Sequence, residues 1–196
     1  MSKKITIIDY GMGNLYSVQN ALKAIGAEPV VTSDAAVIAQ AEKILLPGVG
    51  AFGDCMANLE RSGLIPVIMD SLNSGKPFLG ICLGMQLLFE GSDEAPGFFK
   101  GQVKLLRTEL KIPHMGWNKL ELRNPSPLLD GAEGEYVYFV HSFHAEPEDS
   151  SIITSVCDYG MEVTASVGRG NVQAFQFHPE KSSSVGMRLL KNFVEL

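Results

Sequence analysis

The first half of the chain alternates short apolar stretches with segments whose apolar residues recur every three or four positions. Lys4 to Asp9 is rich in isoleucine and ends in a glycine-containing turn, and helical spacing follows as far as Gly26. Further apolar runs end at Leu46 and at Ile81, each with a helix-like stretch after it. Strands that alternate with helices in this way predict right-handed crossovers and a mostly parallel sheet covered on both faces. Functional groups are then expected at the carboxyl ends of the strands.

The second half has a different pattern, in which short β-rich runs are separated by Gly, Pro and Asp. We therefore expect an α/β protein with additional, antiparallel strands after Gly101. The expected strands are 4–9, 29–32, 43–46, 77–81, 103–106, 119–122, 135–140, 152–156, 163–167 and 172–177. The expected helices are 15–25, 35–41, 58–73, 83–90 and 183–195.

Size and composition favour one globular domain over residues 1–196, since 45% of the chain is hydrophobic and no low-complexity tract or linker interrupts it. The net charge of -6 argues against a broad grip on nucleic acid or anionic lipid. The first apolar run is too short for a signal peptide or a membrane span, so a cytoplasmic location is expected. The three cysteines have no CxxC spacing, which predicts neither a disulfide framework nor a metal site.

One of these cysteines, Cys82, has a setting typical of a nucleophile. It lies between an expected strand and an expected helix, with Gly80 and Gly84 on either side. Small flanking residues permit the sharp turn that lifts a nucleophile out of a sheet, and the helix start favours a thiolate. Taken alone, this segment is equally compatible with a small buried thiol. Cys55 and Cys157 lack such a setting and receive no role.

A histidine and a carboxylate, His178 and Glu180, follow the expected strand 172–177 with a proline between them. The proline stiffens the turn, and the carboxylate is near enough to fix the tautomer of the imidazole. A cysteine at an elbow with a histidine and a glutamate from a distant strand is the arrangement expected for nucleophilic acyl transfer.

Two glycine-rich loops could each bind a negatively charged group. Pro47 to Gly50 follows a strand and could present backbone N–H groups to an oxyanion, although alone it would pass for an ordinary turn. Beside a candidate nucleophile, the oxyanion hole is the better interpretation. Asp9 to Asn14 lacks both the full GxGxxG pattern and a P-loop ending, so we reject a nucleotide site there.

Five ordered segments together resemble the class I, triad-type glutamine amidotransferases, and among them the glutaminase subunits of imidazole glycerol phosphate synthase. The resemblance extends over nearly the whole chain and implies a flavodoxin-like α/β fold. The segments are Ile-Asp-Tyr-Gly-Met-Gly-Asn at 8–14, Leu-Pro-Gly-Val-Gly-Ala-Phe at 46–52, Gly-Ile-Cys-Leu-Gly-Met-Gln at 80–86, Pro-His-Met-Gly-Trp-Asn at 113–118 and Gln-Phe-His-Pro-Glu-Lys-Ser at 176–182.

The resemblance implies roles for individual residues. Cys82 would be the nucleophile, His178 the general base and then acid, and Glu180 the residue that orients the imidazole. The remaining implied residues are Gly48, Val49, Gly50 and Leu83 for the oxyanion hole, Gln86, Glu94, Ser142 and Phe143 for binding glutamine, and Asn14, Trp117, Asn118, Tyr138 and Lys181 for a partner interface. Ser142 and Phe143 would act through backbone groups, and Glu94 is placed only by its spacing.

The implied reaction is hydrolysis of glutamine to glutamate and ammonia through a glutamyl thioester, without a metal or an organic cofactor. In bulk water ammonia would be protonated and lose its nucleophilicity, so it needs a dry path to its acceptor. A partner subunit that provides this path is therefore implied. In the family this is a (β/α)8-barrel cyclase, which forms imidazole glycerol phosphate and aminoimidazole carboxamide ribotide in histidine biosynthesis. Its nucleotide substrate would activate the glutaminase, by turning a peptide in the Pro47 to Gly50 loop.

Three alternatives differ in testable ways. A glutaminase for pyridoxal phosphate, anthranilate or guanylate synthesis is disfavoured by the segments 47–50 and 114–118, where those relatives differ. A cysteine peptidase or small-amide hydrolase would act without a partner. A regulatory pseudo-glutaminase would have no need of an intact Cys82, His178 and Glu180 set. For Tyr138, a core aromatic remains an equal alternative to an interface role.

Overall fold

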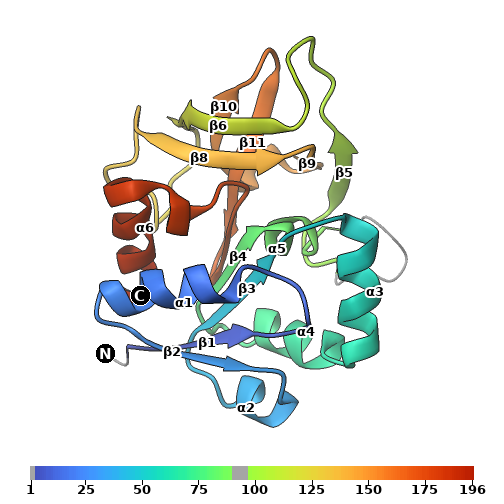
Figure 1. Ribbon diagram of the computed structural model, residues 1–196, viewed down its shortest axis with the longest axis vertical. Coiled ribbons are helices and arrows are strands. Elements are labelled where there is room, and N and C mark those ends of the chain that lie inside the picture. The colour runs from blue at the N-terminus through green and yellow to red at the C-terminus, as the bar shows by residue number, and fades with distance from the viewer. Residues whose placement is uncertain (1–2, 90–96) are drawn as a thin grey trace.

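The computed structural model in Figure 1 describes residues 3–89 and 97–196. Its centre is an eight-stranded sheet in the order β2-β1-β3-β4-β12-β11-β10-β7. The first five strands in this order are parallel, and the last three are antiparallel. Their bounds are β1 Lys4–Ile8, β2 Glu28–Thr32, β3 Ile44–Gly48, β4 Phe78–Cys82, β7 Glu121–Leu122, β10 Ile153–Asp158, β11 Glu162–Arg169 and β12 Val172–Phe175.

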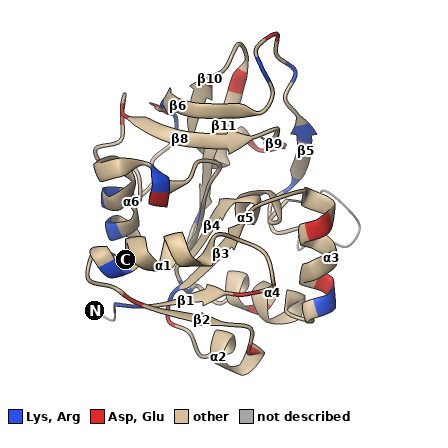
Figure 2. Cartoon of the chain, in the orientation of Figure 1, with Lys and Arg blue, Asp and Glu red and all other residues tan. Residues whose placement is uncertain are grey.

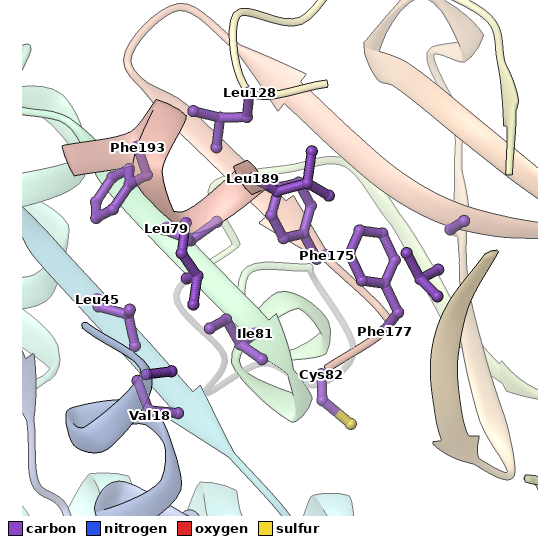
Figure 3. Packing of buried hydrophobic residues seen from close by; sticks show 14 of the residues in the cluster. Val18, Leu45, Leu79, Ile81, Cys82, Leu128, Phe175, Phe177, Leu189 and Phe193 are labelled. Carbon is purple, nitrogen blue, oxygen red and sulfur yellow. The ribbon is translucent and has the colours of Figure 1, made fainter. Parts of the chain in front are cut away.

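Helices cover both faces of the sheet, as the alternating pattern predicts. Side chains alternate along each parallel strand, so Leu45 joins the core beneath α1 and α6 while Ile44 and Leu46 join the core beneath α2, α3 and α4. Figure 3 shows the first of these cores, with Cys82 at its edge. The helices are α1 Leu15–Ala24, α2 Ala35–Ala39, α3 Phe52–Ser62, α4 Ile65–Asn73, α5 Leu83–Gln86 and α6 Ser183–Glu195, with short 3-10 turns at Ser150–Ile152 and Pro179–Lys181.

Two antiparallel ribbons extend beyond the carboxyl ends of the parallel strands (Figure 1). One pairs β5 Gly101–Leu105 with β9 Phe143–Pro147. The other pairs β6 His114–Lys119 with β8 Tyr136–His141. The sequence prediction placed 114–118 in a loop and had no strand at 143–147, so it was wrong for β6 and β9. A strand with Gly116 at its centre, at a φ of 139°, gives a weak sequence pattern.

Two predicted helices also differ from the structure. The expected helix 58–73 is two helices, because Gly63 adopts a left-handed conformation with a φ of 68° and ends α3. Pro66 then lies in the first turn of α4, where a missing N–H is tolerated. The expected helix 83–90 stops at Gln86, and residue 90 lies outside the described part of the chain.

Within residues 3–89 and 97–196, every helix is too short or too polar to span a bilayer. The cytoplasmic location stays a prediction.

Candidate active site

The strand order brings three distant segments to one edge of the sheet. β4 lies between β3 and β12, and its register pairs Cys82 with Gly48 and Ile81 with Phe175. Because the three strands are parallel, the residues that follow each of them meet at the same end. Three segments are therefore neighbours: the loop after Gly48, the Cys82 elbow and the segment leading to His178. Gly48 and His178 are 130 positions apart in the chain (178 − 48).

Cys82 occupies a strained backbone conformation, with a φ of 55° and a ψ of -111°. A non-glycine residue there costs about 1–3 kcal/mol, so the surrounding packing must hold it in place. The flanking glycines make the turn possible, since a Cβ at Gly84 would come within 1.9 Å of the Leu46 carbonyl oxygen and one at Gly80 within 2.8 Å of the Gly84 oxygen. The elbow predicted from the glycine spacing is present.

His178 and Glu180 form a buried pair beside this elbow. His178 Nδ1 lies 2.8 Å from Glu180 Oε1, and both side chains are almost fully buried. Because a carboxylate can only accept, Nδ1 carries a proton and donates it to Glu180. In the neutral ring Nε2 is therefore the acceptor. Nε2 has no hydrogen bond of normal geometry, but the Cys82 side chain is near enough to interact with the ring.

The backbone of His178 is fastened to the neighbouring ribbon. Its N–H donates to the Tyr138 carbonyl at 2.9 Å, and its own carbonyl accepts from the Ser182 hydroxyl at 2.6 Å. The Ser182 hydroxyl in turn accepts from the Tyr138 N–H at 2.9 Å. These bonds hold the imidazole in one orientation relative to Cys82.

Electrostatics favour a charged imidazole at His178. Burial alone would lower its pKa, because a charged ring is poorly solvated inside the protein. Favourable interactions with Cys82 and Glu180 outweigh burial and raise the pKa to about 9. The sequence prediction credited a helix start with stabilising the thiolate, but α5 has only 4 residues. The His178 imidazolium is the stronger source of positive charge.

We expect the His178 ring to titrate near pH 9 in a nuclear magnetic resonance titration, rather than near the ordinary 6.5. In Cys82→Ala the midpoint should fall, because both interactions with the sulfur raise the pKa. A folded-state pKa above the unfolded value means that protonated His178 stabilises the fold below pH 6.5 and that this contribution is lost as pH rises through about 9. His178→Asn assigns the signal, and a wild-type midpoint near 6.5 would contradict the coupling.

A glutamine side chain lies against the sulfur, and a second glutamine holds the first. Gln176 Nε2 donates to Cys82 Sγ at 3.7 Å, and Gln176 Oε1 accepts from Gln86 Nε2 at 2.9 Å. The second N–H of Gln86 donates to the Phe143 carbonyl at 2.9 Å. Gln176 received no role from the sequence, although it stands two residues before His178. Its position at the end of β12, beside β4, was the available signal.

The loop after β3 is held from behind by two side chains that the sequence left without a role. The Tyr10 hydroxyl donates to the Pro47 carbonyl at 3.0 Å, and the Cys55 thiol donates to the Val49 carbonyl at 3.4 Å. Val49 and Gly50 line the cavity above Cys82, whereas Gly48 is buried beneath, where a Cβ would collide with Leu83.

A cavity of about 880 Å³ lies over Cys82 and His178. Its lining includes Gln86, Ser142 and Phe143 from the predicted substrate-binding residues, and Asn14 and Lys181 from the predicted interface residues. The Phe143 carbonyl already accepts two hydrogen bonds, so a backbone contact with substrate there would use the N–H. Glu94 lies outside the described residues. Among the described residues, 3–89 and 97–196, no group of three or more His, Cys, Asp or Glu side chains is placed to hold a metal ion.

The outer face of the β6–β8 ribbon is largely apolar and exposed, with Lys119 at its end beside Tyr136. Trp117 is 52% exposed and meets the Tyr138 ring edge to face, with 6.1 Å between ring centroids. Lys181 lies with its Nζ 5.9 Å from the Tyr138 ring centroid. Asn118 points to the opposite side of β6, where its side chain donates to the Asp158 carbonyl at 2.8 Å. We call Met115, Trp117, Tyr136, Tyr138 and Val140 the ribbon face, and strands β6 and β8 carry little charge in Figure 2.

The sequence matches the class I glutamine amidotransferase family over residues 6–196. The imidazole glycerol phosphate synthase subunit HisH of Syntrophotalea carbinolica is 50% identical over 98% of this chain and 100% of its own length. The subunit of the same name from Aquifex aeolicus is 51% identical over 97% of this chain and 95% of its own. Among solved structures, PurLQS from Thermotoga maritima superposes with a TM-score of 0.81 at 22% identity, covering 100% of this chain and 99% of that one. This likeness shows the fold alone.

Proposed function

The chain belongs to the class I glutamine amidotransferase family, among the HisH subunits of imidazole glycerol phosphate synthase, and we propose that Cys82, His178 and Glu180 perform its glutamine hydrolysis. It is a glutamine amidotransferase subunit of that synthase and serves histidine biosynthesis. The observation that carries the triad is the strained Cys82 elbow beside a buried His178–Glu180 pair with 2.8 Å between Nδ1 and Oε1. This arrangement matches the nucleophile, base and orienting carboxylate of acyl transfer.

In the first half-reaction, the Cys82 sulfur attacks the side-chain amide carbon of glutamine. The carbonyl oxygen becomes negatively charged, and N–H groups of the Val49–Gly50 loop and of Leu83 would bind it. The His178 imidazolium then donates its proton from Nε2 to the departing nitrogen. The C–N bond breaks, ammonia leaves and a glutamyl thioester with Cys82 remains.

In the second half-reaction, His178 has lost its proton and can act as a base. It takes a proton from water, and the resulting hydroxide attacks the thioester carbon. The C–S bond breaks, glutamate leaves and the Cys82 thiolate is restored beside the imidazolium. Glu180 keeps Nδ1 protonated throughout, so Nε2 alone exchanges the proton.

Alkylation with a glutamine-like reagent tests this assignment. A thiol-reactive glutamine analogue should add one equivalent to the peptide that contains Cys82, and glutamine should slow the reaction. The other buried thiols, Cys55 and Cys157, serve as internal controls within the same digest. Modification of either of these instead of Cys82, or no modification at all, would overturn the proposal.

The partner implied by the synthase is its cyclase subunit, which we propose to be a (β/α)8 barrel that docks on the ribbon face. Exposed aromatic side chains that flank a cavity are typical of interface anchors. Asn14 and Lys181 line the same cavity, so a partner seated there would close it over Cys82 and keep ammonia from water. Asn118, which points inward, would contribute less than Trp117.

Truncating Trp117 to alanine should weaken binding of the cyclase subunit by about 30-fold, since a central aromatic anchor contributes roughly 2 kcal/mol or more. The affinity is measured by titration calorimetry with purified subunits. Val37→Ala is the matched control, because Val37 is 36% exposed and lies on α2, at the far end of the molecule from the ribbon (Figure 1). Equal affinities for the two variants would argue that the ribbon face is not the docking site.

A further inference from the structure

Two buried histidines outside the proposed triad connect β6 to the substrate-binding turn. His114 on β6 is 2% exposed and His141 at the end of β8 is 6% exposed, and their Nδ1 and Nε2 atoms lie 3.0 Å apart. His141 Nδ1 lies 2.8 Å from the Phe143 carbonyl oxygen. Neither histidine has a part in the hydrolysis described above, yet His141 lines the cavity.

The hydrogens of this chain can be assigned from its two ends. At one end, the Phe143 carbonyl only accepts, so His141 Nδ1 must carry a proton and its Nε2 must accept. His114 Nδ1 is then the donor to His141, which leaves His114 Nε2 as an acceptor.

At the other end, the Asn118 side-chain nitrogen donates to the Asp158 carbonyl at 2.8 Å, which fixes the orientation of the amide. The same nitrogen lies 3.3 Å from His114 Nε2 and can only donate to it. Both ends therefore require the same pair of neutral tautomers. In agreement, burial lowers the pKa of His114 to about 4 and that of His141 to about 3, so both rings are neutral at pH 7.

The chain continues beyond Phe143 to the sulfur. The Phe143 carbonyl also accepts from Gln86, whose other N–H binds Gln176, and Gln176 donates to Cys82 Sγ. The hydrogen bonds along this path form one continuous series from His114 to the Cys82 sulfur. A buried, continuous series of hydrogen bonds of this kind favours a single arrangement of its side chains.

Resting on the proposed function, we propose that His114 and His141 are positioning residues, which fix the Phe143 carbonyl and through it the orientation of Gln86 beside Cys82. Without the bond from His141, the Phe143 carbonyl is free to turn, and Gln86 loses its fixed acceptor. Binding of glutamine must then also order the Gln86 side chain, and this costs binding free energy. KM should therefore rise more than kcat falls.

Variants that keep, move or remove one N–H donor separate hydrogen bonding from packing. His141→Asn keeps an N–H donor at the δ position, whereas His141→Gln moves the amide to the ε position. His114→Phe keeps the ring stacked on Tyr159, whose centroid is 3.9 Å away, but removes both nitrogens. His144→Phe is the matched control, because His144 is a buried histidine on β9 outside this chain of hydrogen bonds.

Glutamate release is measured for each variant with the cyclase subunit present, together with the rate at which iodoacetamide alkylates Cys82. We expect KM for glutamine to rise about tenfold in His141→Gln and His114→Phe, the equivalent of one hydrogen bond, and to stay within about threefold of wild type in His141→Asn and His144→Phe. The alkylation rate should change less than KM, since iodoacetamide does not use the glutamine site.

Equal KM values for His141→Asn and His141→Gln would overturn the proposal, because the extra methylene of glutamine moves the same amide donor away from the Phe143 carbonyl. So would a wild-type KM in His114→Phe. If wild type itself released no glutamate, the proposed hydrolysis would fail as a whole, which is a different result from active wild type with unaffected variants.

Discussion

Cys82→Ala is expected to lower the rate of glutamate release by about 10⁴-fold or more, measured with the cyclase subunit bound. The sulfur forms the covalent intermediate, and removing one member of a catalytic triad typically abolishes most of the rate enhancement. The oxyanion-binding loop and the cavity remain in the variant, so glutamine and the partner should still bind. The loss should therefore appear in kcat.

The matched control for this variant is Cys157→Ala. Cys157 is another buried free thiol, but it lies on β10, away from the cavity. Its kcat should stay within about threefold of wild type, because it touches none of the reacting groups. If Cys82→Ala kept a tenth of the wild-type rate, Cys82 would not be the nucleophile.

Gly84→Ala is expected to destabilise the fold by more than about 3 kcal/mol, because the new Cβ would lie 1.9 Å from the Leu46 carbonyl oxygen. That oxygen belongs to the central strand β3, so neither atom can move without displacing α5 from the sheet. The free energy of unfolding is measured by urea denaturation at pH 7.

Gly53→Ala provides the control for this substitution. Gly53 lies in α3, and a Cβ there meets nothing within 4 Å. Alanine in a helix should leave stability unchanged or raise it by about 0.5–1 kcal/mol. A Gly84→Ala protein as stable as Gly53→Ala would show that α5 does not pack against Leu46 as closely as the structure has it.

Much of the parallel half of the fold could be predicted from the sequence, because each parallel strand is a short apolar run and each helix has its own periodicity. The break at Gly63 was missed because the apolar spacing of 58–73 continues across it, although Gly63 followed by Pro66 is a usual sequence sign of one helix ending and the next beginning. Strands β6 and β9 were missed because β6 contains His, Gly, Asn and Lys and β9 contains His, Glu and Pro, so neither is an apolar run. Their side chains therefore lack a long buried stripe.

The glycines and the nucleophile of the candidate site could be predicted from the sequence, because they lie within a few residues of one another. The sequence did not reveal the roles of Gln176 and Tyr10, because their contacts join residues 94 and 37 positions apart. Cys55 was also missed, because it supports the Val49 loop from the side that faces away from the cavity. The two histidines of the hydrogen-bonded chain were equally hidden. His114 lies in a quoted segment, but its partner His141 is on another strand, and only the fold places their rings 3.0 Å apart.

The most direct test of the account is glutamate release from glutamine by this chain alone, and then with the cyclase subunit and its nucleotide substrate, with Cys82→Ala as control. The account predicts strong stimulation by the complete complex and its disappearance in Cys82→Ala. Equal activity with and without the cyclase would instead identify an independent hydrolase, and no activity under either condition would contradict the enzymatic assignment altogether.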